Sequence, residues 1–391
     1  MCSKKFDNKT VKNMKEIKLS KSQCELIYNE FLAKLAERIA GIQKEVSSDK
    51  LNDNFLTSDP KEIIQTYLNY PMILRKQNPV YSGNEDEELA SAYLLCRFIG
   101  SAMNFQMARN VFGEFFNSNW GILQKHLSGS KLSKEEKEIY KNHIWHVFRG
   151  LNYKKILKKY ETDLSPLDDR HEEAVKHMLN DMKKRAAKNN SAGELTNLDY
   201  EEKSIYSRLC RTIIEACQFI ESSGGAVAYL WHVEKILEDP DLLDLQKIQK
   251  LSKEIKKNVF GFAAALSGDF FREMGIAIFS KPDTHTVHFF EKLFPEIKQL
   301  PKKCKIEDII ASIILEIADG ASNHEKAITA NQVDKVIWLL KSGRFHLHYG
   351  KNQKTGKVKK YANLWDDKEV SDFCTILRKK LGSKTTHMKS N

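Results

Sequence analysis

The sequence predicts an all-α, two-lobed helical protein with a small C-terminal β-hairpin. Two observations predict the helices. Apolar residues recur at every third or fourth position over long segments, which is the spacing of one helix face. In the longest segments Leu, Ile and Phe fall on more than one face, as in helices buried among other helices. With 391 residues, 41% of them hydrophobic and only 8 Pro, the chain can bury one large core or two ordinary ones.

Three segments show the helical spacing best. They are "CELIYNEFLAKLAERIAGIQKEV" (24–46), "EELASAYLLCRFIGSAMNFQMARNVFGEFF" (87–116) and "SIYSRLCRTIIEACQFIE" (204–221). Each is long enough for several turns and carries few glycines or prolines. We expect each to form a helix of a packed core.

Composition divides the chain into three parts. Residues 151–203 are rich in charge and end in a polar Asn/Ser/Gly stretch, which predicts an exposed helical insertion followed by a linker. The remaining parts are an N-terminal helical region, 1–150, of unknown role and a C-terminal helical region, 204–391. Within the latter, "RFHLHYG" and "KVKKYA" alternate around the turn-like "KNQKTG", which predicts a basic β-hairpin.

The charge of the chain indicates its partner class. The formal net charge is +11 and the pI is near 9.0, so a polyanion, and nucleic acid above all, is the expected partner. Lysine runs such as "KILKKY", "MKKRAAK", "SKEIKKNV" and "KTGKVKK" would contact phosphates if they gather on one face. Each run by itself is also typical of a solvated surface.

Cysteine usage and hydropathy indicate the compartment. The seven cysteines are scattered and never spaced C-x-x-C, so neither a disulfide framework nor a zinc or iron–sulfur cluster is predicted. No apolar run has the length of a signal peptide core or a membrane span. We expect an intracellular protein, cytoplasmic in a prokaryote and with the nucleus possible otherwise, that has no membrane contact and needs no cofactor or metal.

The stretch "FSKPDTHTVHFFEKLF" (279–294) contains the main candidate for a catalytic residue. Pro282 disfavours helical geometry for Lys281, and Asp283 stands where a helix N-cap accepts bonds from the first free N–H groups. One interpretation is a structural cap. The other is functional, because a carboxylate fixed at a helix start can stabilise a developing cation or orient a water molecule.

The wider segment "LSGDFFREMGIAIFSKPDTHTVHFF" (266–290) resembles the catalytic core of the helix-hairpin-helix DNA glycosylase superfamily. The resemblance covers about 205–348, where "QVDKVIWLLKSGRFHLH" (332–348) is similar to a closing helix of that superfamily. It implies double-stranded DNA as the partner, Leu266-Ser267-Gly268 as the phosphate-binding hairpin and Asp283 as the catalytic residue. The hairpin lacks the second glycine of the family pattern, since Asp269 and Phe270 follow Gly268.

The resemblance also implies a reaction. A damaged or deliberately modified base, such as one in invading viral DNA, would be flipped out of the duplex, and Asp283 would stabilise the cationic sugar while water attacks. Family members that also cleave the strand carry a lysine after the hairpin. Residues 268–277 contain none, so a monofunctional glycosylase is expected.

Further site residues follow from these roles. Candidates for the base pocket are His285, Tyr229, Trp231, Phe271 and Trp338, although an aromatic residue at helical spacing usually fills a core. Candidates for DNA phosphate contacts are Ser267, Gly268, Lys281, Lys357 and Lys359. Two other functions stay open: a non-catalytic DNA-binding protein built on the same scaffold, and a helical protein-interaction module.

Overall fold

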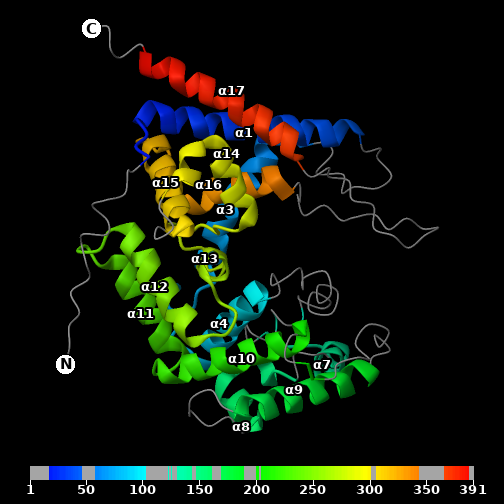
Figure 1. Cartoon of the computed structure of the whole chain (residues 1–391). Helices are drawn as coiled ribbons and strands as arrows, with labels where there is room; N and C mark the ends of the chain where they lie inside the picture. The colour runs from blue at the N-terminus through cyan, green and yellow to red at the C-terminus, as the bar shows by residue number, and fades with distance from the viewer. Residues whose placement is uncertain are drawn as a thin grey trace. The chain divides into compact units, whose positions relative to one another are not determined.

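The protein is all-α in the part of the chain that the computed structural model describes (Figure 1). The described residues are 17–45, 58–102, 122, 125, 130–142, 147–160, 169–188, 200, 201, 204–300, 305–342 and 365–386. They form α-helices and two 3₁₀ helices and contain no strand, which confirms the all-α part of the prediction. The predicted β-hairpin at 344–362 lies outside the described residues.

The chain forms two compact units. Unit 1 combines Met1–Tyr70 with Ala277–Asn391, and unit 2 is Pro71–Ile276. These units do not follow the boundaries at 150 and 203 expected from composition. The first helix of the chain folds with the last ones, while the intervening segment builds its own core.

Unit 1 is built around the N-terminal helix. It contains α1 (Lys21–Glu45), the first part of α3 (Pro60–Lys76), α14 (Thr284–Leu293), η5 (Pro295–Gln299), α15 (Ile306–Ala321), α16 (Ala330–Ser342) and α17 (Asp367–Thr386). Helix α1 packs against α15, α16 and α17, and α14 packs against the same three helices. Figure 1 shows α17 lying along α1.

The helical spacing of α1 explains this packing. Its buried side chains include Ile27, Phe31, Leu35 and Ile39, which recur at intervals of four residues and form one stripe. Phe31 meets Phe289 of α14 edge-to-face, with ring centroids 5.4 Å apart. The core of unit 1 therefore fixes α14, the helix that begins directly after Asp283.

Unit 2 is centred on α10. It contains α4 (Glu87–Ala102), α7 (Lys134–Asn142), η4 (Arg149–Leu151), α8 (Tyr153–Tyr160), α9 (Asp169–Lys188), α10 (Ile205–Ser222), α11 (Ala226–Glu238), α12 (Asp244–Asn258) and α13 (Ala264–Glu273). Helix α10 packs against α4, α8 and α9, and α13 packs against α4 and α12. No helix of the described part is long and apolar enough to cross a membrane.

Within the segment 151–203, the structure describes two helices, α8 and α9, which are not exposed on all sides, while the predicted linker lies mostly outside the described residues. Val175, Met178 and Met182 of α9 are buried, and the Met182 sulfur lies 3.5 Å from Cys210 Sγ of α10. These apolar residues repeat every three or four positions within a polar sequence. Helix α9 therefore covers α10 and belongs to the core of unit 2.

Gly320 allows α15 to approach α1 closely, and this contact provides a test of the unit 1 core. A Cβ atom at Gly320 would lie 2.6 Å from Cys24 Cβ and 2.7 Å from Cys24 Sγ. Gly320→Ala should therefore lower the free energy of unfolding, measured in urea, by about 1–3 kcal/mol. Gly41→Ala in α1 is the control, since nothing lies within 4 Å of its added Cβ and alanine favours the helix by up to about 1 kcal/mol. Equal effects of the two substitutions would contradict the observed packing.

Candidate functional site

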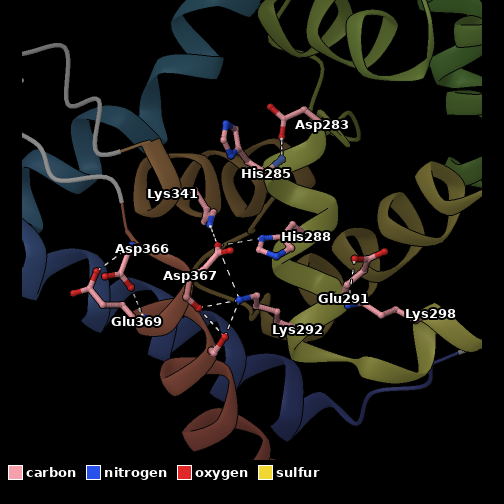
Figure 2. Close-up of polar contacts among 11 residues, drawn as sticks. Asp283, His285, His288, Glu291, Lys292, Lys298, Lys341, Asp366, Asp367 and Glu369 are labelled. Atoms are coloured by element: carbon pink, nitrogen blue, oxygen red, sulfur yellow. Dashed lines mark hydrogen bonds and ion pairs between the residues drawn. The ribbon is translucent and has the colours of Figure 1, made fainter.

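Asp283 is the N-cap of α14, as predicted. Its Oδ1 accepts hydrogen bonds from His285 N at 2.9 Å and Thr286 N at 3.0 Å, and Thr286 Oγ1 lies 3.3 Å away. No donor of the described residues reaches its second oxygen, Oδ2. The side chain is half-buried, and Figure 2 shows it directed at the start of the helix. One oxygen thus holds the carboxylate in place while the other remains available.

The segment before Asp283 is itself held by unit 1. The backbone N–H of Asn331 donates to Ala277 O at 3.0 Å, and the Asp283 N–H donates to Lys281 O at 2.7 Å. Lys281 is only 9% exposed. A side chain so covered is poorly suited to the phosphate contact predicted for it.

His285 lies in the first turn of α14, exposed and next to Asp283 (Figure 2). His288 and Lys292 follow at helical intervals, so the three side chains share one face of α14. This face is polar, whereas Phe289, Phe290 and Leu293 on the other side are buried in the core of unit 1. The polar face of α14 therefore holds its basic residues, with His285 exposed and His288 and Lys292 directed to the first turn of α17.

The predicted hairpin at Leu266–Gly268 is a helix in the structure. Ser267 and Gly268 lie inside α13 and are buried, and the Ser267 N–H donates to Ala263 O at 2.9 Å. Because helical bonds and burial occupy these groups, neither residue presents a free N–H to phosphate. The expectation from the family pattern is corrected at both positions.

A turn between two helices occurs slightly earlier, at 259–263, between α12 and α13. Gly261 has φ of +81°, which suits glycine. Helix α10 anchors the turn: Phe260 N donates to Glu215 Oε2 at 2.6 Å, Thr212 Oγ1 donates to Phe260 O at 3.1 Å, and the Arg211 guanidinium lies 4.2 Å from the Phe260 ring centroid. The turn is thus a fixed element of unit 2.

The start of α13 that follows this turn is open. No side chain caps it, and its first turn has no acidic residue. The N–H groups of Ala264, Ala265 and Leu266 are the first of the helix and have no carbonyl partner within it. Lys256 and Lys257, at the end of α12, are exposed just before the turn. Free N–H groups with nearby ammonium groups are suited to bind an anion.

The predicted pocket aromatics do not gather at one place. Tyr229 and Phe271 are fully buried in the core of unit 2, where they fill space rather than line an opening. Trp231 of α11 is 47% exposed, and its Nε1 donates to Glu85 Oε1 at 3.3 Å. Trp338 packs against the core of unit 1, with Lys335 Nζ 4.8 Å from its ring centroid.

Other predicted positions are not described. Lys357 and Lys359 lie outside the described residues. A cavity of about 340 Å³ in unit 1 includes none of the predicted site residues; it is lined by Glu25, Tyr28, Asn29, Leu32, Ala321, Asn323, Lys326 and Ile328. Within the described ranges, no group of three or more His, Cys, Asp or Glu side chains is placed to hold a metal ion.

Comparison with protein-family models, with curated proteins and with solved structures finds no match to this chain. Function is therefore inferred from its own residues and their geometry. Two features stand out for chemistry: the fixed carboxylate of Asp283 in unit 1 and the open, basic start of α13 in unit 2.

The capping role of Asp283 gives a stability test. Asp283→Ala removes the acceptor for His285 N and Thr286 N and should lower the free energy of unfolding by about 1 kcal/mol. Asp283→Asn should cost only a few tenths of a kcal/mol, since asparagine caps about as well as aspartate. Urea unfolding monitored by circular dichroism measures both, and an equal loss in the two variants would contradict a cap made through one oxygen.

Proposed function

We propose that the protein is a DNA glycosylase that hydrolyses the N-glycosidic bond of a flipped-out base, with Asp283 as its catalytic residue. The observation that carries this proposal is the state of the Asp283 carboxylate. Oδ1 is held by two N–H groups of α14, and no donor of the described residues reaches Oδ2. A carboxylate fixed in this way needs no reorganisation to face a developing positive charge.

The order of elements around Asp283 supports the proposal. Helix α12, the turn at Gly261, helix α13, a connecting segment and the Pro282-Asp283 start of α14 follow one another along the chain. This is the order that the family resemblance requires, with the hairpin placed at 259–263 in place of Leu266–Gly268. We assign phosphate binding to the N–H groups at the start of α13 and to Lys256 and Lys257.

The chemistry follows from these roles. The target base leaves the stack, and the bond from its nitrogen to C1′ of the sugar breaks with positive charge developing on the sugar. The Asp283 carboxylate stabilises that charge and orients the water molecule that adds to C1′. Neither the turn at 259–263 nor α13 contains a lysine, so no amine there forms a Schiff base, and the product is an abasic site.

A non-catalytic DNA-binding protein is the second candidate. The burial of Tyr229 and Phe271 favours it, because two of the residues expected to stack on a flipped base serve as core. The open start of α13 and the exposed Lys256 and Lys257 of α12 support binding under either function. The two candidates differ in whether any base is released.

Base release tests the catalytic proposal. Wild type and Asp283→Asn are incubated with genomic DNAs that carry normal, damaged and heavily modified bases, including viral DNA. Abasic sites are then measured by alkaline cleavage and free bases by mass spectrometry. The wild type should release one class of base, and Asp283→Asn should lower the rate by about 100-fold or more, because the substitution removes the charge that stabilises the transition state.

Asparagine caps a helix about as well as aspartate, so the comparison of wild type with Asp283→Asn isolates the effect of the carboxylate charge. A folded Asp283→Asn variant that binds DNA as the wild type does, yet releases no base, assigns the loss to the carboxylate. Equal release by both proteins would overturn the role of Asp283. No release from any DNA by the wild type, with salt-sensitive binding intact, would establish the binding-only function.

The proposed phosphate site has its own test. Lys256→Ala combined with Lys257→Ala should weaken duplex binding and reduce the slope of log affinity against log salt by about 2, since each phosphate contact contributes about 0.9 to that slope. Fluorescence anisotropy across a salt series measures the change. The control is Lys154→Ala combined with Lys155→Ala on α8, another consecutive and exposed pair of unit 2. Equal slopes for both double variants would contradict the assignment.

A further inference from the structure

A group of basic side chains meets the first turn of α17 in unit 1. His288 and Lys292 come from α14, and Lys341 comes from the end of α16 (Figure 2). All three face the carboxylate of Asp367, with distances to Oδ1 of 3.7 Å for His288 Nδ1, 4.0 Å for Lys292 Nζ and 3.9 Å for Lys341 Nζ. None of these distances is a hydrogen bond.

The basic groups differ in the hydrogen-bond acceptors that the protein provides for them. Lys292 Nζ donates to Asp367 O at 2.8 Å and to Ser371 Oγ at 2.7 Å. Lys341 is only 6% exposed, and its Nζ makes the long ion pair with Asp367 and no hydrogen bond within the described residues. A mostly covered lysine whose Nζ has only a long ion pair within the protein can take an additional anion as its partner.

The charges of this group of side chains also favour an additional anion. Burial lowers the pKa of Lys341 and that of His288, and the Asp367 carboxylate opposes both shifts. That single carboxylate is 75% exposed, so it is free to turn toward solvent. The ammonium groups of Lys292 and Lys341 therefore face one loosely held carboxylate, and His288 adds a positive charge only when it is protonated.

The backbone of α17 adds donors. Asp366 is the residue before the helix, and its Oδ1 accepts from Glu369 N at 2.7 Å. The N–H groups of Asp367 and Lys368 belong to the same first turn and have no carbonyl partner within the helix. Free N–H groups at a helix start favour an anion, and Lys292 Nζ bonds the carbonyl of Asp367 in the same turn.

We infer that His288, Lys292, Lys341 and the first turn of α17 form a binding site for a phosphate group, which the Asp367 carboxylate occupies in part as a built-in competitor. A tetrahedral phosphate offers several acceptor oxygens, enough to reach the two lysines and the N–H groups together. Its source is either a nucleic-acid backbone or a free phosphate compound. This site does not include Asp283, and the inference does not depend on base excision.

Binding of inorganic phosphate to the full chain, measured by isothermal titration calorimetry at constant ionic strength, tests the site. Asp367→Asn should tighten phosphate binding about fivefold, because it removes a negative charge about 4 Å from the cationic groups. Lys341→Met should weaken it at least about tenfold. Lys298→Met is the control. Lys298 is 58% exposed and pairs with Glu291 at 3.9 Å, and it is not part of the proposed site. The phosphate affinity of this variant should therefore match that of the wild type.

A second titration with a short DNA duplex distinguishes the sources. If the Lys341→Met substitution weakens both phosphate and duplex binding, the site takes a nucleic-acid phosphate; if only phosphate binding weakens, it takes a free phosphate compound. Either result supports the inference. If Lys341→Met does not fold, as judged by circular dichroism, Lys292→Met replaces it with the same expectation. Phosphate affinities that are unchanged by both the Asp367 and the lysine substitutions would overturn the inference and leave a purely structural ion cluster.

Discussion

The packing of α1 among the C-terminal helices is the constraint on which unit 1 depends. Phe31 and Leu35 of α1 are fully buried, and their partners come from residues more than two hundred positions later, in α14 to α17. Closing such a long loop costs conformational entropy, which the burial of a continuous apolar stripe offsets. Because α14 packs on this core through Phe289 and Phe290, the position of Asp283 depends on a helix at the other end of the chain.

Local structure was predictable from the sequence, and its assembly was not. The apolar spacing of 24–46 and 204–221 predicted α1 and α10, and the Lys281-Pro282-Asp283 sequence predicted the helix start with its cap. Periodicity identifies the face of a helix that is covered but not the element that covers it. For that reason composition suggested boundaries near 150 and 203, whereas α9 packs on α10 through Val175 and Met178.

The misplaced hairpin has a specific physical cause. The family pattern placed the hairpin at Leu266-Ser267-Gly268, yet helices also accommodate glycine, and Gly268 is in α13. Gly261 is the residue with a positive φ, and it follows Lys256 and Lys257. Basic residues in the last turn and a glycine shortly after are the signals of a helix C-terminus. The sequence therefore contained the information, and the match to a family pattern obscured it.

Helix starts explain where this fold can recognise an anion. In an all-α protein most backbone N–H groups are used within helices, so free donors concentrate in first turns. The chain supplies its own carboxylate at several of these: Glu87 accepts from Ala226 N and Val227 N at the start of α11, and Asp283 does the same for α14. At α13 no side chain provides a cap.

This difference separates two uses of the same geometry. Where a carboxylate of the chain caps a helix start, it accepts from some of the free N–H groups and is itself held in place, as Asp283 is through Oδ1. At α13 no side chain caps the start, and Lys256 and Lys257 precede it in the chain, which is why phosphate binding is proposed there.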